Sequence, residues 1–145
     1  MLITSKIRFY LLLVILSIIL FGCKDNTEEN PVQPAYINFS LNLNDPEFQD
    51  LKIPGNSIFV RSAGTSIVIY RSTVDEFVAY DRICTYEAKE NILVVADSSA
   101  IMVKCTKCGS KYILIDGSPQ DGPARHTLRP YNVTYDGGDY IHISN

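Results

Sequence analysis

The stretch CTKCGSKYILIDGSPQDGPA, residues 105–124, holds two cysteines, a glycine and then a long series of turn residues. Cys105 and Cys108 have the spacing of a metal knuckle, in which backbone amides turn towards the sulfur atoms. Gly109, directly after the second cysteine, permits such a turn. A further thiol, Cys84, lies in the segment CTYE. The sequence therefore predicts a thiol-rich site built from two loops.

The rest of the chain is typical of an all-β fold. Short runs of β-branched and aromatic residues alternate with Gly, Pro, Asn and Asp, which is the signature of an antiparallel sandwich or barrel. Residues 136–138, Asp-Gly-Gly, predict a hairpin turn, and residues 44–51 predict one short helical turn. The predicted strands span residues 36–43, 57–61, 66–71, 76–81, 92–96, 101–104, 111–115, 131–135 and 140–144.

The first residues predict export. Lys6 and Arg8 precede an apolar run over residues 9–22, which is short for a transmembrane helix of about 20 residues. A positive start, an apolar run and a small residue indicate a signal peptide, although an uncleaved N-terminal anchor is the alternative. Cys23 follows in LFGC, which resembles the lipobox of bacterial lipoproteins. In that motif the cysteine is lipidated and becomes the mature N-terminus.

These features predict an order along the chain. We expect a lipoprotein signal peptide over residues 1–22, a polar tether over residues 23–34 and one β domain over residues 35–145. Acyl chains on Cys23 would anchor the protein to a membrane of the cell envelope, outside the cytoplasm.

Charge and residue pattern exclude two functional classes. The formal net charge is −3 and like charges form no run, so no nucleic-acid partner is expected. Ser110 has no nearby His–Asp pattern that would activate it as a nucleophile. No catalytic residue is predicted, and the chain is not expected to be an enzyme by itself.

The two cysteine loops resemble those of the Rieske iron–sulfur domains, whose signature is C-x-H followed by C-x-x-H-G-S. Here Cys84-Thr85-Tyr86 stands for the first loop and residues 105–110 stand for the second. The resemblance covers residues 57–145 and is close to the Rieske-like lipoproteins of Bacteroidetes-type bacteria. It implies a Rieske-like antiparallel β-sandwich or barrel with a small cluster-binding subdomain. The run after the second loop also matches, at Lys111, Tyr112, Asp116, Gly117, Gly122, Pro123, Ala124, Leu128 and Tyr131.

The resemblance implies a [2Fe–2S] cluster with unusual ligands. Cys84 and Cys105 would bind one iron, and Cys108 with Tyr86 would bind the other. Both histidines of the family are thus replaced by residues that are anionic as ligands. Anionic ligands favour oxidised iron, so the reduction potential is expected near the plant-ferredoxin value of about −400 mV.

Two further features of the family bear on the site. The resemblance implies that Ser110 and Tyr112 donate hydrogen bonds to the sulfur atoms of the cluster. The family's additional disulfide between the two loops is missing, since residues 87–89 carry no thiol and Lys107 lies inside the second loop.

Two other uses of the thiols remain open. Two of the three cysteines could form a disulfide in an oxidising compartment. Alternatively they could bind a single Zn²⁺ or iron ion, with His126 or His142 as the fourth ligand. Two functional hypotheses follow from these possible uses of the thiols. One is a membrane-anchored electron-transfer module with an unknown redox partner, and the other is a structural or binding lipoprotein on a vestigial Rieske fold.

Overall fold

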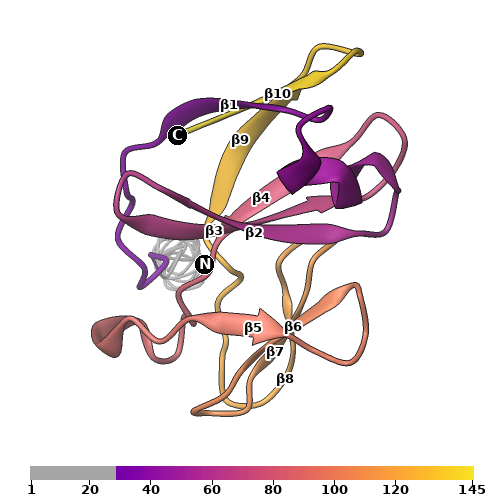
Figure 1. Cartoon of the computed structure of the whole chain (residues 1–145). Helices are drawn as coiled ribbons and strands as arrows, with labels where there is room; N and C mark the ends of the chain where they lie inside the picture. The colour runs from indigo at the N-terminus through magenta and orange to yellow at the C-terminus, as the bar shows by residue number, and fades with distance from the viewer. Residues whose placement is uncertain (1–28) are drawn as a thin grey trace, which may run out of the picture.

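The computed structural model describes residues 29–145. The predicted signal peptide and Cys23 lie outside these residues. No helix within residues 29–145 is long and apolar enough to cross a membrane. The described chain is almost entirely β-structure (Figure 1). Its elements are β1 (Asn38–Asn42), η1 (Pro46–Lys52), β2 (Ser57–Ser62), β3 (Thr65–Arg71), β4 (Phe77–Asp81), η2 (Ala88–Glu90), β5 (Val94–Ala96), β6 (Met102–Cys105), β7 (Lys111–Ile113), β8 (Pro119–Asp121), β9 (Pro130–Tyr135) and β10 (Tyr140–Ser144).

The larger sheet has the strand order β1-β10-β9-β4-β3-β2, and neighbouring strands are antiparallel. The sheet twists strongly, so that β1 and β10 lie over β2 and β3 in Figure 1. Side chains from both halves and from η1 pack into one hydrophobic core. Its buried members are Ile37, Leu41, Leu43, Leu51, Ile67, Ile69, Phe77, Ala79, Tyr131, Ile141 and Ile143.

The smaller sheet, β5-β6-β7-β8, forms a subdomain at one end of the molecule (Figure 1). A second hydrophobic core joins it to the outer face of β3 and β4. Ile67 and Ile69 of β3 therefore face the first core, while Val68 and Tyr70 face the second. Burial on both faces explains why residues 67–70 of β3 are continuously apolar instead of alternating.

The predicted strands are all present, with small shifts at their ends. β8 was not predicted, because its sequence, Pro-Gln-Asp, has no strand-forming residue. The predicted helical turn is present as the 3-10 helix η1.

The predicted tether differs from the structure at its end. Val32 is only 1% exposed, and the Arg129 guanidinium donates a hydrogen bond of 2.8 Å to its carbonyl oxygen. The Asn30 side chain likewise donates to the Thr127 carbonyl oxygen at 2.8 Å. The last residues of the predicted tether therefore pack against the domain, because Val32 is an apolar residue with a buried site to fill.

Candidate metal centre

The first loop of the site follows β4. Ile83 forms an isolated β-bridge with Leu93, and the Cys84 backbone N–H donates to the Ile92 carbonyl oxygen at 2.8 Å. A turn then begins, in which the Glu87 N–H donates to the Cys84 carbonyl oxygen at 3.1 Å. These bonds fix the backbone of Cys84 against the strand that leads into β5.

The second loop connects β6 to β7 and has the structure of a knuckle. The Gly109 N–H donates to the Cys105 carbonyl oxygen at 3.0 Å, and Gly109 has a φ of 78°, which favours glycine. The backbone N–H groups of Lys107 and Cys108 act to lower the pKa of Cys105, and the Ser110 N–H acts to lower the pKa of Cys108. Amide donors near a sulfur atom stabilise its thiolate.

The two loops bring three thiols together. The sulfur atoms of Cys84, Cys105 and Cys108 all lie within 4.8 Å of one another. The Cys84 and Cys108 sulfur atoms are 3.6 Å apart. Cys84 and Cys105 are buried in the second core, whereas Cys108 is partly exposed. Three of the four predicted metal ligands therefore converge at one point, although they belong to separate loops.

The turn at Gly122-Pro123-Ala124 packs against Ser110 of the second loop. The Ala124 N–H donates to the Ser110 hydroxyl oxygen at 3.1 Å, and the Ser110 hydroxyl lies 3.2 Å from the Cys108 sulfur. Gly122 has a φ of 85°, and a Cβ atom there would lie 2.5 Å from the Ser110 Cα. Only glycine allows the turn to approach this closely, so the glycine of this motif has a direct role in placing Ser110.

Tyr112 contacts the thiol of Cys84. Its hydroxyl lies 3.3 Å from the Cys84 sulfur, and it accepts a hydrogen bond of 3.2 Å from the Thr85 N–H. The Thr85 hydroxyl donates to the His126 carbonyl oxygen at 2.9 Å and lies 3.0 Å from the Tyr112 hydroxyl. Since the single Thr85 hydroxyl proton goes to His126, the Tyr112 proton is directed to Thr85 or to Cys84. Ser110 and Tyr112 thus each lie beside a different cysteine sulfur, and their hydrogen bonds to a cluster stay a prediction.

Cys105 and Cys108 differ in acidity. Burial raises the pKa of Cys105 to about 11. Burial also acts to raise the pKa of Cys108, but hydrogen bonds from the Ser110 hydroxyl, the Ser110 N–H and the other two thiols outweigh it. The pKa of Cys108 is therefore below its ordinary value. Cys108 is the thiol of this pair that ionises more readily.

Lys107 ties the two loops together across the site. Its ammonium group lies 3.0 Å from a Glu87 carboxylate oxygen and 2.5 Å from a Glu90 carboxylate oxygen. Glu90 and Glu87 raise the pKa of Lys107. These ion pairs connect the same two loops between which the family's additional disulfide is missing here. The ion pairs could not be predicted from the sequence, because the paired residues belong to different loops.

Lys107→Met is expected to weaken metal binding without unfolding the domain. Exposed ion pairs are individually weak, so the loss in metal affinity should not exceed about tenfold, and it should shrink at high salt. Competition titration with a chromophoric chelator measures it. Lys104→Met is the matched control, because Lys104 is a similarly exposed lysine that pairs with Asp97 at 3.2 Å. Equal losses in the two variants would contradict a specific role for Lys107.

Tyr86, His126 and His142, the other predicted ligands, have different surroundings. Tyr86 is 57% exposed, and its hydroxyl forms no hydrogen bond with any residue in the described range. Among residues 29–145, no His, Asp or Glu joins the three cysteines within their 4.8 Å group, so neither predicted histidine does. His142 lies in β10 and bonds the Ser40 hydroxyl at 3.0 Å, on the larger sheet. The expectation that His126 or His142 completes a zinc site is therefore not met.

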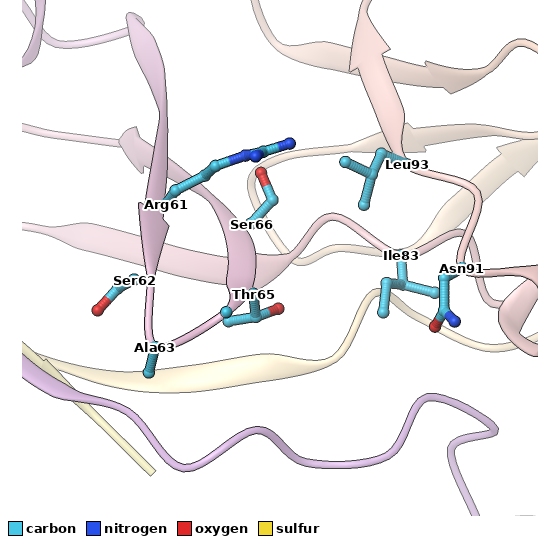
Figure 2. Close-up of a pocket in the computed structure, with 9 residues that line it drawn as sticks. Arg61, Ser62, Ala63, Thr65, Ser66, Ile83, Asn91 and Leu93 are labelled. Carbon is cyan, nitrogen blue, oxygen red and sulfur yellow. The ribbon is translucent and has the colours of Figure 1, made fainter.

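A groove of about 610 Å³ lies between the β2–β3 turn and the segment after Cys84 (Figure 2). Arg61 extends across it towards Leu93, with Ser66 beside it (Figure 2). Burial and the neighbouring Arg61 lower the pKa of Arg82, whose guanidinium bonds the Ser66 hydroxyl at 2.9 Å. None of the three cysteines lines this groove, so it is separate from the thiol site.

No protein-family profile and no curated protein matches the chain. Solved structures do resemble it. A chain of naphthalene 1,2-dioxygenase with indole bound in its active site gives a TM-score of 0.58 at 14% identity, over 79% of this chain and 27% of that one. The ferredoxin of carbazole 1,9a-dioxygenase from Nocardioides aromaticivorans IC177 gives 0.45 at 18% identity, over 63% and 86%. A protein described as the small subunit of an NADH-dependent nitrite reductase from Mycobacterium tuberculosis gives 0.46 at 16% identity, over 77% and 97%.

The fold is Rieske-like. The all-β antiparallel architecture with a small four-stranded subdomain confirms the predicted fold class, and the dioxygenase chain shares that fold over most of the present domain. At this level of identity the likeness concerns the fold alone.

The Rieske fold implies a [2Fe–2S] cluster, whose four ligands are divided into pairs on two irons. Three thiols are suitable donors for iron. They gather in one compact group, however, and no His, Asp or Glu of residues 29–145 joins it. The donor set fits sulfur ligation of a metal, but it does not fit the two-pair arrangement of the family.

Proposed function

We propose that this protein is a membrane-anchored electron-transfer module in which Cys84, Cys105 and Cys108 hold an iron–sulfur centre. The observation that carries the proposal is the convergence of their sulfur atoms within 4.8 Å, in two loops of a Rieske-like fold. The sequence resemblance supports iron as the metal. A [2Fe–2S] cluster and a single iron ion would both use these thiolates.

The surroundings of the thiols suit one-electron chemistry. Iron would be reduced by one electron from a donor protein and oxidised again by an acceptor, and no bond need be broken. Cys84 and Cys105 are buried, which keeps water from two of the iron–sulfur bonds, while the partly exposed Cys108 brings the centre near the surface. Electron transfer requires a centre close to the protein surface, and the redox partner would dock on the side of Cys108.

The test is a redox titration of the full chain, purified in detergent without oxygen. We expect an iron EPR signal that changes reversibly with one electron, is lost in Cys84→Ser and is kept in Tyr86→Phe. Far-UV circular dichroism checks that each variant is folded. An iron-loaded protein that shows no reversible redox change would overturn the proposal.

A structural metal site is the second candidate function. It is favoured by the burial of Cys84 and Cys105 within the second core, where a bound ion would hold the small subdomain to β4. Zn²⁺ binds thiolates tightly and has no redox chemistry. Zinc as the bound metal in purified protein, together with loss of folding on chelation, would favour this function over electron transfer.

Membrane anchoring rests on the segment LFGC and predicts lipidation of Cys23. In a bacterial host supplied with labelled fatty acid, the full chain should be labelled and recovered with membranes, whereas Cys23→Ser should lose the label. Cys84→Ser is the matched control and should keep it. Labelling that persists in Cys23→Ser would contradict anchoring through this residue.

A further inference from the structure

We infer that the three thiols hold a single metal ion with its fourth position open to solvent, instead of a two-iron cluster. The inference rests on the proposed function, because it specifies the metal centre on which that function depends.

The distances between the sulfur atoms carry the first step. A tetrahedral ion with metal–sulfur bonds of about 2.3 Å holds its sulfur ligands about 3.8 Å apart. The Cys84 and Cys108 sulfur atoms are 3.6 Å apart, and the Cys105 sulfur lies within 4.8 Å of both. One ion can therefore contact all three thiolates with only small adjustments.

A two-iron cluster would require a different arrangement of the same residues. Thiolates on different irons are held further apart than thiolates on one iron, because the bridging sulfides and the iron–iron axis separate them. The Rieske resemblance would assign Cys84 to the first iron and Cys108 to the second. In the structure these two sulfur atoms lie only 3.6 Å apart. Cys108 is therefore placed to bind the same metal ion as Cys84.

The knuckle leads to the same conclusion independently of that distance. Cys105 and Cys108 lie in a C-x-x-C turn that is closed by a hydrogen bond of 3.0 Å from the Gly109 N–H to the Cys105 carbonyl oxygen. A C-x-x-C turn presents both sulfur atoms to one ion, as in structural zinc sites. The replacement of a histidine by Cys108 thus changes which metal this loop can reach, because a cysteine side chain is shorter than a histidine side chain.

No His, Asp or Glu of residues 29–145 joins the three thiols to supply a fourth ligand. The Tyr112 hydroxyl is already bonded to Thr85, and the Ser110 hydroxyl already accepts from the Ala124 N–H. Cys108 is the partly exposed member, so solvent approaches the ion on that side. Three protein ligands and one water are the arrangement of metal sites that keep an open position.

The experiment measures metal and acid-labile sulfide per chain in the full protein, purified in detergent without oxygen, and then adds Co²⁺ to the metal-free protein as a probe. We expect one metal ion per chain, no labile sulfide, and a Co²⁺ spectrum with intense tetrahedral bands and thiolate charge transfer. Cys108→Ser should lower Co²⁺ affinity by more than the roughly 10- to 100-fold that residues around a ligand contribute, while Tyr86→Phe should leave it unchanged.

The outcomes separate this inference from the proposed function. Two irons and two sulfides per chain would overturn the single-ion inference and leave electron transfer standing. One zinc ion without sulfide would support the inference and overturn electron transfer. Absence of any bound metal and of Co²⁺ binding would overturn both. Because the stoichiometry is measured on the unaltered protein, a variant that fails to fold does not decide the result.

Discussion

Gly122→Ala is expected to lower the free energy of unfolding by about 2–5 kcal/mol, the sum of backbone strain and steric overlap in a packed site. Gly122 has a φ of 85°, and its new Cβ would meet the Ser110 Cα at 2.5 Å and the Ser110 N at 2.7 Å. Both contacts are with backbone, which cannot move aside as a flexible side chain could. The second cysteine loop must shift instead, so metal binding should fall together with stability. Urea unfolding followed by circular dichroism, with a Co²⁺ titration, measures both effects.

Gly137→Ala is the matched control for this variant. Gly137 has a φ of 78°, close to that of Gly122, but nothing lies within 4 Å of the position that its Cβ would occupy. Only the backbone strain remains, which costs about 1–2 kcal/mol, and Co²⁺ affinity should be unchanged. If the two variants lost equal stability, the close approach between Gly122 and Ser110 would have no energetic importance.

Asp81→Ala is expected to cost about 3 kcal/mol or more, because it leaves one buried and two partly buried donors without a partner. The Asp81 side chain accepts hydrogen bonds from the Thr65 hydroxyl at 2.9 Å, the Tyr131 hydroxyl at 2.9 Å and the Ile83 N–H at 2.8 Å. Burial and the neighbouring Asp81 raise the pKa of Tyr131, so its hydroxyl remains a donor. The Ile83 N–H directly precedes Cys84, so this variant should also displace the first cysteine loop.

Asp136→Ala provides the comparison for Asp81. The Asp136 carboxylate also accepts two backbone N–H groups, from Gly138 at 2.8 Å and Tyr140 at 3.1 Å, but on an exposed hairpin where water can replace it. Its loss should cost only about 0.5–1.5 kcal/mol and should leave metal binding intact. Thermal unfolding of the two variants, together with Co²⁺ titration, tests the difference. A cost for Asp81→Ala as small as that for Asp136→Ala would show that water satisfies the buried donors.

Much of the fold could be predicted because the strands carry their own signals. Residues 67–70 of β3 are continuously apolar and β10 alternates, and the Asp-Gly-Gly turn before β10 specifies the hairpin. β8 has no such signal, since its pairing with β7 is imposed by the neighbouring turn. The burial of Val32 could not be predicted either, because Val32 contacts Arg129, which is far away in the sequence.

The cysteines that form the site could be predicted from the sequence, but the arrangement of their sulfur atoms could not. Cys84, Cys105 and Cys108 were found by their spacing, and the resemblance placed Ser110 and Tyr112 beside them. The relative positions of the sulfur atoms depend on how the two loops meet, and short motifs do not encode that. Lys107 was noticed in the sequence only as the residue that replaces a cysteine. Its ion pairs with Glu87 and Glu90 appear when the loops are folded together.

The central claim is that the three cysteines bind a metal together, and X-ray absorption at the metal edge of the purified full chain tests it most directly. We predict a first shell of three sulfur atoms at about 2.3 Å, one lighter oxygen or nitrogen neighbour and no second metal nearby. A shell made only of oxygen and nitrogen atoms would show an adventitious metal and contradict the claim. A strong metal–metal contribution would contradict the single-ion form and restore the two-iron cluster of the fold family.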